Sequence, residues 1–351
     1  MPRLLSLDVF RGLTIALMIL VNTPGDGRHV YAPLRHAEWH GWTITDCVFP
    51  SFVWIVGVAI ALSLKPRAGI YKDILRRAAI LFGLGLLIYA FPTFPLDTFR
   101  ILGVLQRIAI CYAVAAIVFL KTGIRGQIAA TLGLLGGYWA IMAFIPAPGF
   151  AAGDLSVEGN FAHYVDRIVL GAHNYAETKT WDPEGIISTL PAIATCLLGV
   201  LGGHILKAPM DMRRRVVRLL IVGAALIAAG LALDPLLPIN KKLWTSSFSL
   251  FMAGLDFALL GALIWLIDIR QVVKPFRPAM IMGRNAIALY LASEFIEIIL
   301  NFMHWKQPVY ETIFLPLATP INASLLYAVT YTALHLALAY FLYKRNLFFR
   351  A

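Results

Sequence analysis

The chain has 351 residues, of which 60% are hydrophobic and only 14% are charged. Soluble domains are roughly 45–50% apolar and about 25% charged, so this composition excludes an ordinary soluble globular domain. The formal net charge of +11 could suit a nucleic-acid-binding protein, but in so apolar a chain the placement of the positive charges must be considered first.

Long apolar runs recur along the whole chain. A bilayer core about 30 Å thick needs roughly 20 mostly apolar residues per helix, and about ten runs meet this condition. They predict an all-α integral membrane protein, a polytopic helical bundle forming a single domain over residues 1–351. The predicted spans are residues 7–23, 47–64, 76–92, 101–120, 127–145, 186–206, 216–233, 246–267, 279–300 and 322–343.

Positive charge is unevenly distributed between the two sets of connecting segments. If the first span starts inside, 21 of the 30 Lys and Arg residues lie in the inner segments, including Arg3 and Arg350 near the two ends. Cytoplasmic loops are enriched in Lys and Arg, so both termini are predicted to be cytoplasmic. The outer side keeps Arg28, Arg35, Arg100, Arg107, Arg167, Lys179, Lys241, Lys242 and Lys306. The net charge therefore reflects topology, and we expect no nucleic-acid partner.

The first span begins and ends with polar residues. Asp8 and Arg11 are three residues apart on one helical face, where they can form either a structural ion pair or the wall of an entry path. The same helix reaches Asn22 just before Pro24 and Gly25, which predicts that the amide lies near the outer membrane surface.

The segment 33–50 is the richest in groups that could carry chemistry. His36 and His40 titrate near neutrality, as a general base for an amine or hydroxyl group requires. Asp46 could orient an imidazole ring or stabilise its cation, and Trp39 lies between the two histidines. The alternative is an ordinary aromatic and histidine belt at the membrane interface.

Further polar motifs flank later spans. Trp181, Asp182 and Glu184 precede the sixth span, where carboxylates and an aromatic face would suit a sugar or would simply cap the helix. Gln106 and Arg107 lie inside the fourth span, and an arginine at that depth is expected to face a polar cavity, to meet a carboxylate or to extend to the interface.

Several common signatures are missing from the sequence. It has no GxxxxGK[ST] phosphate loop, no HExxH zinc motif and no GxSxG nucleophile turn. Cys47, Cys111 and Cys196 lack CxxC spacing and the histidines lack metal-ligand spacing, so no metal is expected.

These motifs, in this order, resemble the heparan-α-glucosaminide N-acetyltransferase catalytic domain family and its bacterial homologues, within the transmembrane acyltransferases. The resemblance rests on residues 6–12, 35–41, 46–50, 100–107, 181–185, 240–244, 283–290 and 342–344. It implies transfer of an acetyl group from cytosolic acetyl-CoA, a co-substrate, to an amino sugar on the non-cytoplasmic side. The family's active histidine maps onto His36 and not onto His40, and its asparagine maps onto Asn22. The loop between Asn22 and His36 is longer here, and the lysosomal member's luminal region before the first span has no counterpart, which argues against heparan itself as the acceptor.

We therefore expect His36 to act as general base or acetyl relay, assisted by Asp46, with Asn22 bonding the oxyanion. The candidate acceptor contacts are Trp39, His40, Trp181, Asp182, Glu184, Lys241 and Trp244. The candidate coenzyme A contacts are Asp8, Arg11, Gln106, Arg107, Arg284 and Asn285.

Other functions and assemblies stay open at this point. A permease for a sugar or peptidoglycan fragment would use the same polar cluster for binding, and an O-acyltransferase of envelope glycans would use the same donor. Apolar helix faces can meet lipid or a second copy, so a homodimer is possible. The compact chain without a eukaryotic targeting segment favours a bacterial inner membrane.

Overall fold

The computed structural model describes residues 4–349, so the predicted inner residues Arg3 and Arg350 lie outside the described part. Between residues 4 and 349 the regular structure is helical, with one isolated β-bridge joining Gly41 and Asn240. The chain is thus an all-α integral membrane protein with multiple apolar spans.

Eight helical segments of the described residues are long and apolar enough to cross a membrane, and a bent pair of helices makes a possible ninth. The eight are α1 (Leu5–Asn22), α2 (Ile44–Ser63), α4 (Val104–Lys121), α5 (Ile124–Phe144), α7 (Thr189–Lys207), α8 (Met212–Leu233), α9 (Ser246–Leu263) with its extension to Ile269, and α13 (Pro320–Lys344). The bent pair consists of the segment Lys274–Gly283, which contains α10 (Arg277–Gly283), and of α11 (Ala286–Phe302).

The third predicted span, residues 76–92, differs from the structure. It corresponds to α3 (Ile70–Ala90), which begins earlier and includes Lys72, Asp73, Arg76 and Arg77 in its first two turns. These charges leave too short an apolar stretch for α3 to count as a span by length and composition, so the structure supports eight or nine spans where the sequence predicted about ten.

The chain folds into two compact units that interleave along the sequence. The first unit comprises Met1–Ala37, Trp42–Phe49 and Leu260–Ala351, and the second comprises Glu38–Gly41 and Pro50–Leu259. Each unit is described separately below.

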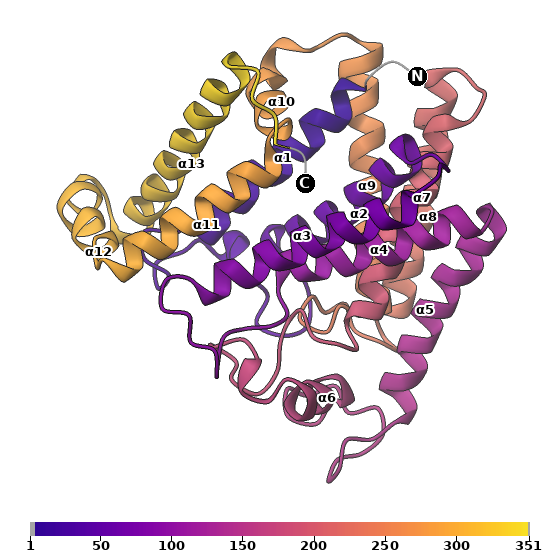
Figure 1. Cartoon of the computed structure of the whole chain (residues 1–351), viewed down its shortest axis with the longest axis horizontal. Helices are drawn as coiled ribbons and strands as arrows, with labels where there is room; N and C mark the ends of the chain where they lie inside the picture. Colours follow the sequence, from indigo (N-terminus) through magenta and orange to yellow (C-terminus); the bar gives the residue numbers. More distant parts are fainter. Residues whose placement is uncertain (1–3, 350–351) are drawn as a thin grey trace. The chain divides into compact units, whose positions relative to one another are not determined.

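In the first unit, α1 packs directly against α10 (Figure 1). A Cβ atom on Gly12 would lie 1.7 Å from the carbonyl oxygen of Ala279, and one on Gly283 would lie 1.9 Å from the carbonyl oxygen of Asp8. Only glycine permits this approach from both sides, as in the close helix crossings of membrane proteins. The crossing therefore depends on two glycines that are far apart in the sequence.

The bend between α10 and α11 measures 71° and falls at Arg284 and Asn285. Asn285 is 1% exposed, and its side chain bonds the final segment of the chain. Its Nδ2 donates to the carbonyl of Leu347 at 3.0 Å, and its Oδ1 accepts from the backbone N–H of Phe349 at 3.1 Å. Past α11, the short α12 (Lys306–Val309) leads to α13.

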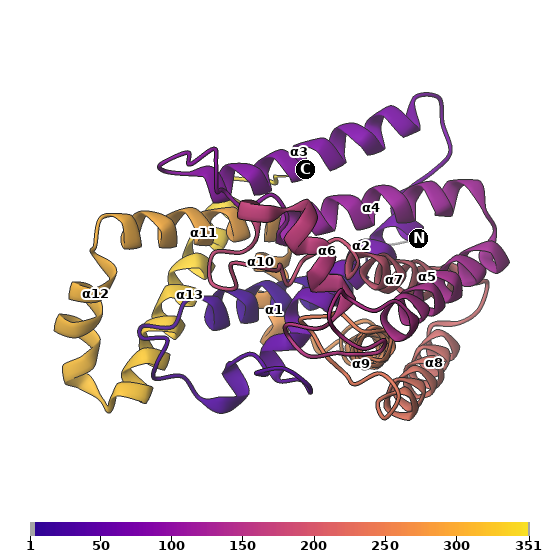
Figure 2. The same ribbon diagram turned by 90° about the horizontal axis from the view of Figure 1, so that it is seen from below.

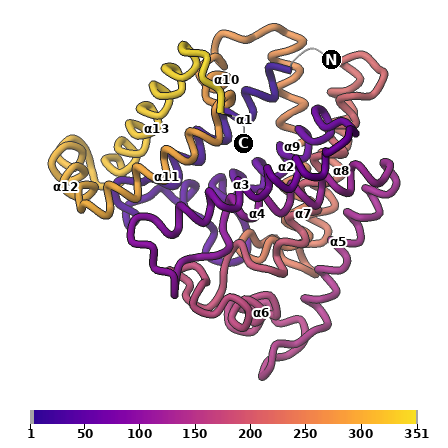
Figure 3. Tube along the Cα trace, in the orientation of Figure 1, coloured from indigo at the N-terminus to yellow at the C-terminus, as the bar shows by residue number. Residues whose placement is uncertain are grey.

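In the second unit, α3 lies along α4, and α7 packs against α4 and α5 (Figure 2). The helix α7 is buried along most of its length, and its Gly199 meets Gly57 and the carbonyl of Trp54 on α2. The connection from α5 to α7 runs through long loops with one short helix, α6 (Phe161–Val169), between them (Figure 3). These loops carry most of the polar residues considered next.

Candidate active site

In the first unit, His36 forms a hydrogen-bonded pair with Asp46. His36 lies in the extended segment before α2, and Asp46 lies in the first turn of that helix. The Nδ1 atom of His36 is 2.6 Å from Oδ1 of Asp46. Since a carboxylate only accepts, Nδ1 carries the hydrogen of this contact, and in the neutral imidazole the lone pair is then on Nε2.

Asp46 is itself held by the backbone. Its Oδ2 atom accepts from the N–H groups of Ala37 and Thr43, each at 3.0 Å. The carboxylate is 1% exposed, whereas the side chain of His36 is 48% exposed. A fixed, buried acid thus orients an accessible imidazole, the arrangement by which a histidine base is held ready in acyl-transfer sites.

Asn22 is the last residue of α1 and is exposed. Among residues 4–349 no hydrogen bond joins it to His36 or Asp46. The structure therefore brings together two of the three predicted catalytic residues by direct contact, and Asn22 is separate from them.

The four predicted coenzyme A contacts of the first unit gather around the crossing of α1 with α10. Asp8 and Arg11 are 3.6 Å apart, and the backbone of Asp8 touches Gly283. Arg284 lies over the ring of Tyr343 at 5.0 Å, next to Asn285 in the helix bend. The other two, Gln106 and Arg107, belong to the second unit.

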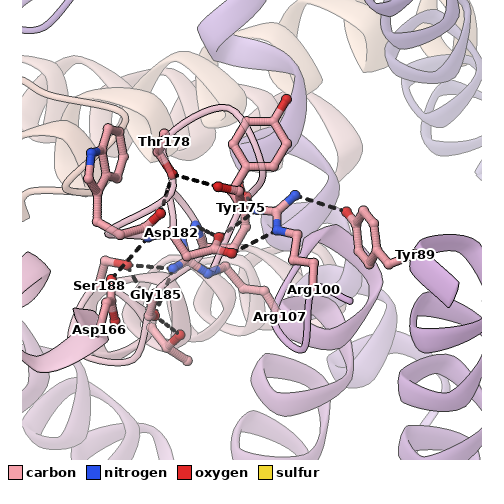
Figure 4. Close-up of polar contacts among 12 residues, drawn as sticks. Tyr89, Arg100, Arg107, Asp166, Tyr175, Thr178, Asp182, Gly185 and Ser188 are labelled. Atoms are coloured by element: carbon pink, nitrogen blue, oxygen red, sulfur yellow. Dashed lines mark hydrogen bonds and ion pairs between the residues drawn. The ribbon is translucent and has the colours of Figure 1, made fainter. Parts of the chain in front are cut away.

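In the second unit, Arg100 is the centre of a buried charge network (Figure 4). Its Nε and Nη2 atoms donate to both oxygens of Asp182 at 2.7 and 2.5 Å, and Nη2 also donates to Glu184. Lys241 approaches the other oxygen of Glu184 at 3.6 Å. Two cations thus face two buried carboxylates, and the segment 181–185 is fixed by them.

The network sets the protonation states of its members. Burial by itself would raise the pKa of Glu184, but Lys241 and Arg100 outweigh this effect and hold the pKa at about 2. Burial opposes the charge on Arg100, yet Tyr89 and the two carboxylates raise its pKa well above the usual value. Glu184 and Arg100 are therefore an ion pair at neutral pH.

Arg107 is 1% exposed and bonds uncharged oxygens. Its Nη2 donates to the carbonyl of Gly185 at 3.0 Å and to Oγ of Ser188 at 2.5 Å, and its guanidinium lies over Trp244 at 5.0 Å. It therefore neither extends to the interface nor bonds a carboxylate directly. Gln106 beside it is fully buried.

The aromatic residues predicted to bind a sugar differ in accessibility. Trp181 is 6% exposed and stacks on His163 with ring centroids 4.1 Å apart, and Trp244 is fully buried. Trp39 meets both rings of the stack edge-on and is half-buried, while His40 is exposed. Trp39 and His40 thus keep accessible surface, whereas Trp181 and Trp244 are buried.

The loop that carries Trp39 and His40 is tied to the segment before α9. The backbone N–H of Gly41 donates to Ile239 at 2.7 Å, and Nζ of Lys242 donates to the carbonyl of Glu38 at 2.7 Å. His40 and Asn240 are 3.3 Å apart between side-chain nitrogens. This contact could not be predicted from the sequence, since its partners are about 200 residues apart.

Sequence reasoning also missed residues that organise the site. The sequence identifies Arg100 as an outer positive charge and as the first residue of a family motif but predicts no partner for it, and it does not predict the roles of Tyr89, Asp166 and His163. Burial raises the pKa of Asp166 to about 6, while its oxygens accept backbone N–H groups from Ile186 at 2.9 Å and Asp182 at 3.4 Å. The only available signal was that two acids in an apolar context, Asp182 and Glu184, would need cationic partners.

No three His, Cys, Asp or Glu side chains between residues 4 and 349 are grouped as metal ligands.

The sequence is similar to those of known proteins. Heparan-alpha-glucosaminide N-acetyltransferase of Mus musculus is 28% identical and that of Homo sapiens is 29% identical, each alignment covering 99% of this chain. The chain spans 60% of the length of these curated relatives. Residues 3–221, which include His36, Asp46, Arg100 and Glu184, match the family described as "Heparan-alpha-glucosaminide N-acetyltransferase, catalytic". The chain therefore belongs to the heparan-α-glucosaminide N-acetyltransferase catalytic family.

Proposed function

We propose that this chain is a transmembrane N-acetyltransferase that moves an acetyl group from cytosolic acetyl-CoA to an amino sugar on the non-cytoplasmic side. The observation that carries the proposal is the His36–Asp46 pair, in which a buried carboxylate holds Nδ1 of an accessible imidazole. Family membership supplies the reaction type.

In the proposed reaction, Nε2 of His36 takes a proton from the acceptor amine as its nitrogen attacks the thioester carbonyl. The new C–N bond forms, the C–S bond breaks, and the thiolate of coenzyme A receives the proton from the imidazolium. Asp46 stabilises that imidazolium and keeps the ring oriented. If Nε2 attacks the thioester instead, the C–S bond breaks and coenzyme A leaves as the thiolate, which takes up a proton. The acetyl group then stays on His36 until the amine attacks it, which forms the C–N bond and releases the imidazole.

The remaining predicted roles are retained as part of the proposal. Asn22 is the proposed donor to the oxyanion, and Asp8, Arg11, Arg284 and Asn285 form the proposed coenzyme A site of the first unit, with the arginines suited to phosphate.

In the second unit, Trp39 and His40 are the proposed sugar contacts. Gln106 and Arg107 are proposed to bind the pantetheine arm. Trp181, Asp182, Glu184, Lys241 and Trp244 are proposed to hold the loops in shape.

The membrane arrangement belongs to the proposal as well. We propose a single acyltransferase domain with both termini in the cytoplasm of a bacterial inner membrane and with α3 as an additional span. A homodimer through apolar helix faces is compatible with this arrangement.

The decisive experiment uses purified protein in liposomes, with acetyl-labelled acetyl-CoA on the cytoplasmic side and glucosamine on the other side. Wild type is expected to form N-acetylglucosamine, and His36→Ala is expected to lose at least about a hundredfold in kcat. His304→Asn is the matched control, because this exposed histidine has φ of 55°, which asparagine tolerates.

Each competing function gives a different result. Sugar flux without acetyl-CoA and without an acetylated product would identify a permease. A product that mild base cleaves would identify an O-acyltransferase, since an amide survives that treatment. Acid-quenched protein that retains label on His36 in the absence of acceptor would identify the acetyl-histidine route.

A further inference from the structure

We propose that the amino-sugar acceptor carries a long hydrocarbon chain linked through phosphate, and that the chain binds in an apolar groove of the first unit. This inference rests on the proposed acetyltransferase function and names the class of its substrate. It depends on a cavity, on the hydrogen bonds that shape it and on the charges at its rim.

The groove lies between the end of α1, the loop after it and the start of α13, and it is partly open to the surface. Its walls are mostly apolar: Leu20 and Val21 from α1, Val30 and Leu34 from the loop, and Leu325 and Ala328 from α13. An open apolar groove suits a segment of hydrocarbon chain lying along it and offers little to a free sugar.

Hydrogen bonds hold the loop against α13 and so define the shape of the groove. The backbone N–H groups of Gly25 and Asp26 donate to the carbonyl and hydroxyl oxygens of Ser324 at 3.2 and 3.0 Å. Farther along the loop, Oη of Tyr31 donates to Oδ1 of Asn322 at 2.6 Å. The two walls therefore keep a fixed separation.

The same chain segments carry the predicted catalytic residues. Val21 directly precedes Asn22, and Leu34 is two residues before His36. A chain lying in the groove would therefore bring its polar head towards the segment that presents the histidine. Because α1 ends and α13 begins here, the groove is at the same end of two apolar spans, where an anchored substrate can enter from the bilayer.

Two arginines, Arg28 and Arg35, lie in the loop that forms one wall of the groove. Arg28 has two acidic neighbours, Asp26 and Glu311. Arg28 is bonded to Asp26 at 3.0 Å, while Arg35 is exposed and, within residues 4–349, bonds through its Nε atom, which donates to the carbonyl of Val30 at 2.8 Å. The planar guanidinium of Arg35 suits the oxygens of a phosphodiester.

The test compares two acceptors that share glucosamine 1-phosphate, one esterified with farnesol and the other with methanol. Wild type in detergent is expected to show kcat/KM at least about tenfold higher for the farnesyl ester. Val30→Trp fills the groove and is expected to abolish this ratio. Ala32→Trp introduces the same side chain at an exposed position outside the groove and should preserve the ratio.

Equilibrium binding of the fluorescent farnesyl ester without acetyl-CoA gives a second readout. Val30→Trp should weaken binding of the ester about tenfold. Leu325→Ser should weaken it as well, because it makes the groove wall polar without adding bulk. This second variant keeps the test valid if Val30→Trp does not fold.

Three results would overturn the inference. Equal kcat/KM for the two esters would show that the chain is not recognised. Equal loss in Val30→Trp and Ala32→Trp would show that the groove is not the site. Displacement of the bound ester by phosphatidylglycerol at equal concentration would show that the groove takes any bilayer lipid. Groove-dependent binding without acetylation of either ester would instead reject the acetyltransferase function, and with it the role of the bound molecule as acceptor.

Discussion

The two carboxylate oxygens of Asp46 have different hydrogen-bond partners. One oxygen bonds His36, and the other accepts two backbone N–H groups from residues on either side of the loop. Asp46 therefore holds both the loop and the imidazole in place. Replacing Asp46 tests the orientation of the imidazole while His36 itself is kept.

We expect Asp46→Asn to lower kcat by about a hundredfold to ten-thousandfold while KM for acetyl-CoA stays within about threefold. An amide can donate to Nδ1, which would place the hydrogen on Nε2 and remove the lone pair that accepts the proton. Steady-state kinetics in liposomes measure both constants. Asp97→Asn, at an exposed loop position, is the control, and a kcat for Asp46→Asn equal to that of the control would reject the assignment.

Asp166 provides a pH-dependent contribution to stability in the second unit. Its pKa is raised by burial to about 6 from an ordinary 3.8, so the folded state binds a proton more tightly than the unfolded state. The stabilisation is complete below pH 4 and is lost as the pH rises through about 6, on the order of 3 kcal/mol in all.

Asp166→Asn keeps a neutral group at this position and removes the titration. We expect the Tm difference between variant and wild type to shift in favour of the variant as the pH rises from 4.5 to 7. Thermal unfolding of both proteins at several pH values measures this. A difference that stays constant across the range would show that Asp166 has the same pKa in both states.

At the residue scale, the sequence predicted part of the site. It predicted that Asp46 could orient a histidine ring, and the structure places Asp46 in contact with His36, while the catalytic role of the pair stays a prediction. It did not predict the pairing of Arg100 with Asp182, because partners 82 residues apart meet only after the loops fold. Local spacing carries information about helix faces and short loops and none about such distant pairs.

At the scale of elements, the crossing of α1 and α10 is the most constrained helix contact of the first unit. Gly12 and Gly283 each face a carbonyl oxygen of the other helix, so neither helix can retreat from an added methyl group without losing the contact. In a bilayer this close packing must supply much of the association energy, because lipid tails solvate apolar side chains well.

Gly12→Ala is expected to lower the Tm by about 2–4 °C, since overpacking of this kind costs about 1–3 kcal/mol. Gly83→Ala in α3 has open space around its Cβ position and should leave the Tm unchanged or raise it slightly. Thermal unfolding in detergent compares the two variants. Equal Tm values would show that the helices separate easily at this crossing.

Predicted helix boundaries failed where polarity interrupts an apolar pattern. The sequence predicts that the third span starts at residue 76, whereas α3 starts at Ile70. The first two turns of α3 are charged and therefore resemble a loop in the sequence. The predicted span 279–300 is broken at Arg284 and Asn285, since hydropathy does not register a bend when both sides remain apolar. The long uninterrupted spans, such as α7, were placed within a few residues.

At the scale of the whole molecule, membrane class and family followed from composition and from the order of short motifs, whereas orientation stays a prediction. Orientation can be tested with single cysteines in a Cys47→Ser background, because Cys111 and Cys196 are buried. We expect Leu96→Cys to react with an impermeant maleimide in intact cells. Arg213→Cys should react only after permeabilisation, since it lies in a basic segment predicted to be cytoplasmic.

Both positions are exposed, so labelling depends on the side of the membrane and not on burial. Labelling of Arg213→Cys in intact cells would invert the topology and place the His36 segment in the cytoplasm.

The contact between α1 and α10 also sets an order of events during synthesis. Gly12 leaves the ribosome roughly 270 residues before its partner Ala279, so α1 must wait in the membrane through most of translation. Throughout that interval Asp8 and Arg11 can pair with each other, while the face of α1 that will meet α10 stays open to lipid or to insertion factors. The bend after α10 is completed later still, because Asn285 bonds Leu347 and Phe349, which are among the last residues made. The first unit can therefore close only when the chain is almost finished, and a ribosome that stalls before this point would leave the first helix without its partner.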